Sequence, residues 1–448
     1  METITITKSD LAWSYIAKFF SVANGLIVLP YMLNKLSAQE LGLNYLMFSV
    51  SSLVTLLDFG FVYQFGRNFT YVYSGAQHIQ KEGIEEITTI GSDLNYRLLS
   101  TLLKTAKMVY GLLALVCFFL MMTLGTLYIY HSTAGFTLVE NSFYMWTLFS
   151  VSTGFNIFFF YYNSLLVGSG KIKENNIATI LSKLFYLAIS FLLLYLDCGL
   201  FSIVIANAIA PFVQRFYSHR CYYTKELKLK LINDIPLCEV KELFLVIWYN
   251  SKKIGLNCLG SYAIGNASTF ILGAFLPLPV VASFGLLKQF VGFILNFSQI
   301  PFSTYQPKLA YYKVNGKTKE IRRLTIETMA TYWVCMLGGS LLFLISAPCI
   351  LHIIKSNTEL PSLCIMGVYI VAMLLEGNHN NCTTLITVFN KVPYVKANLL
   401  TGFAIISLTF LSLEFTAYGL YAVVVIQFVC QLIYNNWKWP LYVYKKII

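Results

Sequence analysis

Residues 362–390 read SLCIMGVYIVAMLLEGNHNNCTTLITVFN, an apolar stretch with a polar run, EGNHNN (376–381), at its centre. The stretch is long enough to cross a bilayer, because a hydrocarbon core of ~30 Å needs about 20 residues of helix. Polar side chains at that depth cost free energy unless they are paired, hydrated or functional. The stretch therefore predicts a membrane-spanning helix with a functional centre.

The composition of the whole chain agrees with this first stretch. Of the 448 residues, 57% are hydrophobic and 12% are charged, whereas an ordinary soluble domain has roughly 45–50% and 25%. We therefore predict an all-α polytopic membrane protein with twelve transmembrane helices. The windows of sufficient apolar length are 11–34, 43–66, 108–130, 142–168, 177–196, 199–217, 247–276, 279–301, 326–350, 362–390, 397–413 and 418–436.

The distribution of basic residues predicts the orientation. If the N-terminus is cytoplasmic, 25 of the 32 Lys and Arg residues lie in cytoplasmic segments and only Lys35 and Lys355 lie in the opposite loops. Basic residues beside transmembrane ends are retained in the cytoplasm, so we expect both termini inside. Basic loops facing anionic lipid also account for the net charge of +12 without a nucleic-acid partner.

The chain contains an internal repeat. A shift of 220 lays CGLFSIVIAN (198–207) over YGLYAVVVIQ (418–427), with Gly199 on Gly419. An even number of helices per copy gives both halves the same orientation. We expect two six-helix lobes that bind substrate between them by alternating access, and an insertion, AQHIQKEGIEEITTIGSD, in the first. The predicted boundaries are 1–222 for the first lobe, 223–246 for a cytoplasmic linker, 247–448 for the second lobe and 76–93 for the insertion.

Ionisable residues inside the predicted spans are the candidate site residues. Lys18 and Asp58 lie at similar depth, roughly 11–13 Å from the same membrane face, and can pair. Such a pair either locks two helices together or opens when substrate or a proton binds. Lys252 and Lys253 diverge by ~100° on one helix, so they cannot both face one cavity. Lys288 lies too deep to reach the membrane surface easily.

Glu376 is the deepest acidic candidate. His379 and Asn380 follow at i+3 and i+4 and share its helical face. Glu376 and His379 can share a proton and couple transport to a gradient. Alternatively, Gly377 and the asparagines break the helix, and their amides satisfy the freed backbone groups. The lysines outnumber the acidic residues, so the predicted cavity is cationic and favours an anionic ligand such as a carboxylate or a phosphate.

Three segments resemble a known family: LLDFGFVYQFGR (56–67), SGKIKENN (169–176) and VASFGLLKQF (281–290). Over nearly its whole length the chain resembles polysaccharide flippases of the multidrug/oligosaccharidyl-lipid/polysaccharide (MOP) exporter superfamily, and in particular bacterial O-antigen flippases of the Wzx type. By this resemblance, the helix-two motif is represented by Asp58, Gly60 and Arg67, and Arg67 joins the candidate cavity residues. The other candidates come from depth and charge.

The resemblance implies a transporter and not an enzyme. Its substrate would be an undecaprenyl-diphosphate-linked O-antigen repeat unit, moved from the cytoplasmic to the periplasmic leaflet of the bacterial inner membrane during lipopolysaccharide biosynthesis. The implied partners are the bilayer, a coupling ion (proton or sodium), an O-antigen polymerase and a chain-length regulator. The ten cysteines show no metal-ligand spacing, and we expect no metal and no cofactor.

Two other functions are compatible with a dozen helices. A MATE-like drug or metabolite exporter would share the fold and differ in the chemistry of its cavity. An integral membrane O-antigen polymerase or ligase would carry a large periplasmic loop with catalytic Arg or His residues. The longest outer loops predicted here, 131–141 and 351–361, are short for such an enzyme.

Overall fold

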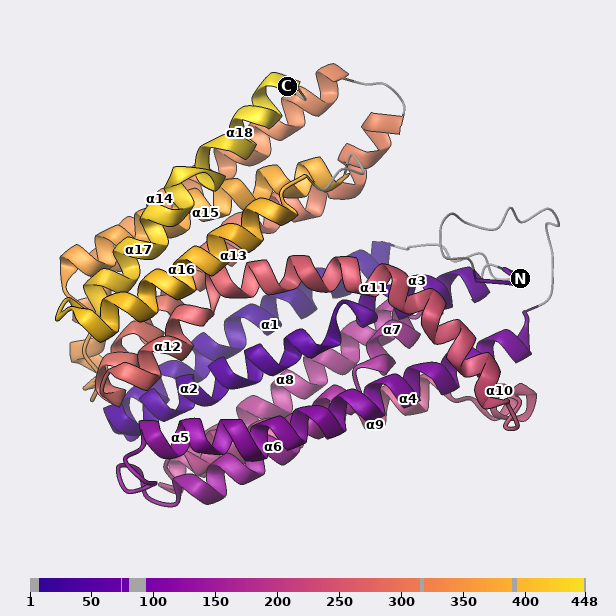
Figure 1. The fold of residues 1–448 in the computed structure, drawn as a ribbon, viewed down its shortest axis with the longest axis horizontal. Helices are drawn as coiled ribbons and strands as arrows, with labels where there is room; N and C mark the ends of the chain where they lie inside the picture. The colour runs from indigo at the N-terminus through magenta and orange to yellow at the C-terminus, as the bar shows by residue number, and fades with distance from the viewer. Residues whose placement is uncertain (1–7, 74, 80–93, 315–317, 389–392, 447–448) are drawn as a thin grey trace. The chain divides into compact units, whose positions relative to one another are not determined.

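The part of the chain described by the computed structural model is mainly helical and contains no strand (Figure 1). Helices lie in all twelve predicted windows. Within the described residues, eight segments are long and apolar enough to cross a membrane, or nine when one bent helix pair counts as a single span. The protein is therefore a multi-pass membrane protein, while the count of twelve crossings and the orientation stay predictions. The described residues are 8–73, 75–79, 94–314, 318–388 and 393–446.

The chain divides into two compact units. The first contains residues 1–28 and 50–258, and the second contains 29–49 and 259–448. Three long helices belong to both. The two predicted six-helix lobes follow the sequence repeat and stay a prediction, and most of the predicted insertion lies outside the described residues. The three shared helices are α1 (Lys8–Lys35), α2 (Ala38–Thr55) and α11 (Leu237–Gly265).

In the first unit, helices pack both against their neighbours in sequence and against helices further along the chain. Helix α8 lies along α9, α3 lies along α7, and α4 lies along α6. The Asn95 side chain caps α4 by accepting a 3.0 Å hydrogen bond from the backbone N–H of Leu98. The helices are α3 (Phe61–Tyr73), α4 (Tyr96–Leu120), α5 (Thr126–Ser132), α6 (Ser142–Phe158), α7 (Tyr161–Gly168), α8 (Ile172–Tyr195), α9 (Phe201–Tyr222) and α10 (Lys225–Lys230).

The second unit is built on two long consecutive helices, α13 and α14, with α15 packed against α13, α17 and α18. The turn after α1 belongs to it: Asn34 Nδ2 donates to the carbonyl oxygen of Ile354 at 2.8 Å. The helices are α12 (Ala267–Phe275), α13 (Leu278–Val314), α14 (Thr318–Ile354), α15 (Leu363–Val388), α16 (Val395–Phe415), α17 (Gly419–Ile433) and α18 (Asn435–Lys446).

The sequence repeat is also a repeat of backbone conformation. Gly199 and Gly419, which align at the shift of 220, have φ angles of 56° and 51° at the starts of α9 and α17. Glycine adopts such angles without steric cost. With the same shift, α8 falls on α16, and α6 with α7 falls on α15. The two copies therefore share local structure as well as sequence.

The outer faces of the helices are apolar. On α4, the side chains of Leu112, Leu115 and Phe119 are about two-thirds exposed and recur at helical spacing. On α14, Val334, Leu341 and Ile345 are exposed to a similar extent. Continuous exposed apolar faces of this size mark contact with a membrane. Lipid is therefore the solvent for these faces.

Candidate functional site

Lys288 lies at a break between two helices of the second unit. Asn266 separates α11 from α12, and the two helices meet at a bend of 48°. Lys288 Nζ, on α13, donates to Asn266 Oδ1 at 2.9 Å and to Thr269 Oγ1 at 3.2 Å. Among the described residues, Lys288 forms no ion pair. The described hydrogen-bond partners of the ammonium group are thus neutral oxygens.

The residue after Lys288 extends this polar site. Gln289 Oε1 accepts a 2.7 Å hydrogen bond from the hydroxyl of Tyr45, on α2. A Cβ atom at Gly285, one turn earlier, would overlap the Tyr45 ring. The absence of a side chain at Gly285 therefore lets the Tyr45 ring pack directly on the backbone of α13.

Glu376 is bound by amides and not by a cation. Its carboxylate accepts hydrogen bonds from Gln431 Nε2, on α17, and from the side chain of Asn380, one turn along α15. Asn435 Nδ2 donates to Gln431 Oε1 at 2.9 Å and also to Thr401 Oγ1 at 3.1 Å. These residues form a buried polar network, which we call the Glu376 network.

The polar run 376–381 does not break its helix. Helix α15 continues from Leu363 to Val388, so the alternative in which Gly377 and the asparagines interrupt it is wrong. Side-chain partners satisfy part of the run. Trp333 Nε1, on α14, donates to Asn378 Oδ1 at 3.2 Å.

His379 is buried, with 2% of its surface exposed, and lies next to the Glu376 network. Its ring makes a hydrogen bond to the backbone of Asn435, while Nδ1 has no hydrogen-bond partner among the described residues. The contacts of Glu376 are with Gln431 and Asn380. A proton shared between Glu376 and His379 stays a prediction.

Asp58 marks a break in the second predicted span. A 3₁₀ turn (Leu56–Asp58) follows α2, and Phe59 and Gly60 have φ angles of 45° and 72° before α3 begins. Asp58 Oδ2 accepts from the N–H of Val62 at 3.3 Å, which caps α3. Asp58 Oδ1 accepts from the Tyr110 hydroxyl, on α4, at 2.7 Å. The window 43–66 is therefore two helices joined at the aspartate.

The remaining candidates lie apart from these groups or outside the described side chains. Arg67 is exposed and donates to Gln64 Oε1 at 2.7 Å. Lys252 is exposed, with its Nζ 5.5 Å from the centre of the Tyr249 ring. The side chains of Lys18 and Lys253 lie outside the described part, so the Lys18–Asp58 pair stays a prediction.

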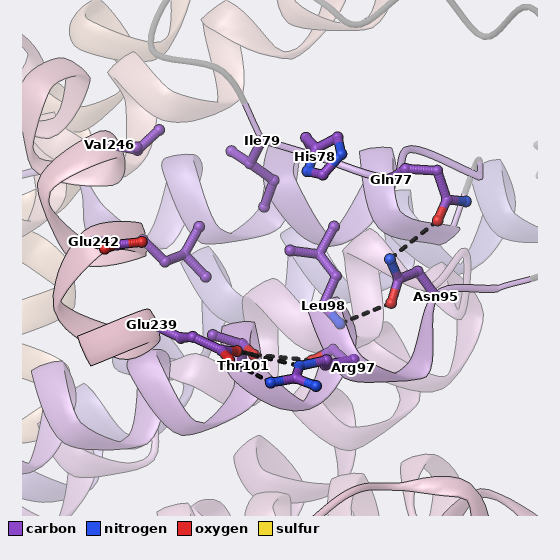
Figure 2. Close-up of a pocket in the computed structure, with 11 residues that line it drawn as sticks. Gln77, His78, Ile79, Asn95, Arg97, Leu98, Thr101, Glu239, Glu242 and Val246 are labelled. Atoms are coloured by element: carbon purple, nitrogen blue, oxygen red, sulfur yellow. Dashed lines mark hydrogen bonds and ion pairs between the residues drawn. The ribbon is translucent and has the colours of Figure 1, made fainter. Parts of the chain in front are cut away.

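The first unit also has a pocket of about 380 Å³ between the start of α4 and α11, which Figure 2 shows. Arg97 Nη2 forms an ion pair with Glu239 Oε1 at 2.5 Å, and this hydrogen bond holds the pKa of Glu239 below its ordinary value. The pocket contains none of the candidate site residues. Its lining consists of Gln77, His78, Ile79, Asn95, Arg97, Leu98, Thr101, Glu239, Glu242, Leu243 and Val246.

Several polar partners in the structure are not candidates from the sequence. Tyr110, Gln431 and Asn435 are neutral, so a search for charges inside the membrane misses them. The run NNW (435–437) is a signal, because two adjacent amides follow an apolar span there. In the count of basic residues by membrane side, Arg215 belongs to the cytoplasmic segments. In the structure its side chain is buried, with 4% of its surface exposed.

Comparisons with known proteins support the architecture. No protein-family model matches the chain, and no curated protein matches it in sequence. An inward-facing multidrug resistance MATE family transporter of the MOP superfamily is similar over 96% of this chain and 95% of its own, with a TM-score of 0.64 and 11% identity. The lipid II flippase MurJ, in an inward closed conformation, is similar over 97% of this chain and 88% of its own, with a TM-score of 0.64 and 14% identity.

A MOP superfamily transporter from Pyrococcus furiosus is similar over 98% of this chain and 95% of its own, with a TM-score of 0.57 and 12% identity. The chain shares the fold of these three structures. This fold occurs in a multidrug transporter and in a lipid flippase alike, so the architecture does not identify the function.

Proposed function

We propose that the protein is a flippase that moves undecaprenyl-diphosphate-linked O-antigen repeat units from the cytoplasmic to the periplasmic leaflet of the bacterial inner membrane. The proposed mechanism is alternating access of a cationic cavity between two six-helix lobes. The headgroup of such a substrate carries a diphosphate, and a cation in a region of low dielectric binds that anion strongly.

The observation that carries the proposal is the environment of Lys288. This residue lies in the middle of a predicted span, at the break between α11 and α12, and its described partners are the neutral oxygens of Asn266 and Thr269. Discontinuous helices near the midplane form substrate sites in many transporters. Lys18, Arg67, Lys252 and Lys253 are proposed to add to the positive charge of the cavity.

Asp58, Glu376 and His379 are the proposed coupling and gating residues. In the Glu376 network, the carboxylate accepts hydrogen bonds from two amides. Protonation of Glu376 would remove one acceptor and weaken the bond to Gln431, which joins α15 to α17. A proton that binds Glu376 from one side of the membrane would thereby weaken the contact between α15 and α17. If the coupling ion is sodium, it would bind the carboxylate oxygens of Glu376 instead.

A second candidate function, a MATE-like exporter, is favoured by the two carboxylates. Asp58 and Glu376 form no ion pair among the described residues, and an organic cation would complement either of them. The similarity to a multidrug resistance MATE family transporter supports the exporter as much as the similarity to MurJ supports a flippase. The sign of the charge that the substrate carries therefore separates the two candidates.

Gene deletion and complementation in the host test the proposal. We expect the deletion to abolish the O-antigen ladder and to accumulate lipid-linked repeat units on the cytoplasmic side. Lys288→Met should not restore the ladder, whereas the matched variant Lys319→Met, at an exposed lysine, should restore it. A normal ladder in the deletion strain, combined with greater sensitivity to cationic dyes, would exclude the flippase and favour the exporter.

A further inference from the structure

Arg215, in α9, is a buried cation that the proposed transport mechanism does not use. Only 4% of its surface is exposed. Its Nη1 donates to Asn163 Oδ1, on α7, at 2.7 Å, and its Nε has no hydrogen-bond partner among the described residues. No acidic side chain of the described part pairs with it. A buried guanidinium with an unsatisfied N–H is costly unless an anion completes its coordination.

Further basic side chains, from α4 and α8, lie near the C-terminal end of α9. Lys107 Nζ, on α4, lies 5.5 Å from the centre of the Tyr223 ring. Lys171, at the start of α8, donates to the carbonyl oxygen of Cys221 at 2.7 Å. Burial, together with the positive charges of Lys228 and Lys107, lowers the pKa of His219 below its ordinary value. Like charges gathered in this way repel one another, so a bound anion would stabilise the cluster.

Tyrosine side chains lie close to His219, one turn after Arg215 on α9. The hydroxyl of Tyr162 lies 2.9 Å from His219 Nδ1, and the rings of Tyr161 and Tyr162 stack with their centres 4.4 Å apart. The ring of Tyr223 lies 4.7 Å from that of His219. Tyrosines combine an apolar ring with a hydroxyl donor, and they are enriched at the level of lipid headgroups.

The depth of Arg215 fits that level. It lies seven residues before the end of α9 at Tyr222, which corresponds to about 10 Å along the helix. The basic segment that follows α9 is predicted to be cytoplasmic. In that orientation the guanidinium lies just below the cytoplasmic surface of the membrane.

In the internal repeat, the position that corresponds to Arg215 carries a neutral residue, at the start of α18. With the shift of 220, Arg215 falls on Asn435. Asn435 is fully buried, and both ends of its amide are satisfied: Nδ2 donates to Gln431 and Thr401, and Oδ1 accepts from Trp439 Nε1 at 3.2 Å. The second copy therefore has a neutral side chain with its hydrogen bonds satisfied, Asn435, where the first copy has a cation with an unpaired N–H, Arg215.

We propose that Arg215, together with Lys107 and His219, binds the phosphate group of a lipid headgroup in the cytoplasmic leaflet. The headgroup is either that of a bulk anionic phospholipid or the diphosphate of a polyprenyl carrier. The site does not depend on the flippase function, because a drug exporter with these residues would bind the same phosphate.

Thermal unfolding of the full-length protein in detergent, with added lipids, tests the site. The probes are short-chain phosphatidylglycerol, undecaprenyl diphosphate and, as a lipid without phosphate, diacylglycerol. We expect a saturable rise in Tm with a phosphate lipid and none with diacylglycerol. Loss of one charged hydrogen-bond donor should weaken the apparent Kd about tenfold in Arg215→Gln.

Arg220→Gln is the matched control, because Arg220 lies on the same helix and is exposed. It should bind as the wild type does. Saturable binding of phosphatidylglycerol assigns the site to bulk phospholipid, and binding of undecaprenyl diphosphate alone assigns it to the carrier. If Arg215→Gln does not fold, Lys107→Gln replaces it, with weaker binding expected. Equal affinities in all variants for every phosphate probe would overturn the proposal.

Discussion

At the scale of single residues, the membrane interior of this protein is stabilised by amides and hydroxyls. Glu376 meets Gln431 and Asn380, Lys288 meets Asn266 and Thr269, and Asp58 meets Tyr110. A neutral partner satisfies a charged group without cancelling its charge. In the proposed mechanism, each of these groups exchanges a protein partner for a substrate or an ion.

Gln431→Leu should destabilise the second unit. The substitution removes the Nε2 donor to Glu376 and the Oε1 acceptor of Asn435. Leaving such buried groups unpaired costs about 1–3 kcal/mol. The measurement is the Tm in detergent, taken also in the Glu376→Gln background, where the lost bond is no longer charged and the effect should shrink. Equal losses in the two backgrounds would show that Glu376 and Gln431 are not coupled.

Gly377→Ala should lower the Tm, whereas Gly367→Ala on the same helix should not. A Cβ at Gly377 would overlap Tyr332 Oη and Leu295 Cδ1, but a Cβ at Gly367 meets nothing within 4 Å. Overpacking costs about 1–3 kcal/mol, and Ala otherwise favours a helix over Gly. If the two variants unfold at the same temperature, the close packing of α14 on the polar run is wrong.

At the scale of elements, one helix break contains Asp58 and another lies beside Lys288, whereas Glu376 lies in an unbroken helix. The sequence contains the signals: Asp58 and Gly60 precede Phe61 as a side-chain acceptor for the first turn and a turn residue would, and Gly265 precedes Asn266. Apolar length dominates a prediction of spans, because a window of about 20 residues can be one straight helix or two joined ones. The break positions depend on caps and tertiary partners, which a hydropathy window does not report.

Asp58→Ala should destabilise the first unit more than Asp58→Asn. The alanine removes the cap of α3, worth about 1 kcal/mol, and also leaves the Tyr110 hydroxyl without its acceptor. Asparagine retains an oxygen that can accept from either donor. The measurement is the Tm of Asp58→Ala and of Asp58→Asn, each also taken with Tyr110→Phe, which removes the hydroxyl that Asp58 accepts from. A stability of Asp58→Ala equal to that of the asparagine variant would mean that Asp58 does not cap α3.

At the scale of the whole molecule, much could be predicted because membrane helices are a local property. Helices lie in each of the twelve windows, since apolar length and the absence of water are enough to require a helix. The repeat is visible in the sequence because Gly199 and Gly419 keep the same backbone conformation. The burial of Arg215 could not be predicted, because counting basic residues by membrane side does not say which of them face protein.

The function of the whole molecule is tested most directly by translocation in a purified system. The protein is reconstituted into liposomes that contain a fluorescently labelled undecaprenyl-diphosphate-linked repeat unit, and a membrane-impermeant quencher is added outside. We expect wild-type protein to expose inner-leaflet label to the quencher, whereas Lys288→Met at equal incorporation should not. Label that stays protected with wild-type protein, while the same vesicles transport a cationic dye, would refute the flippase function.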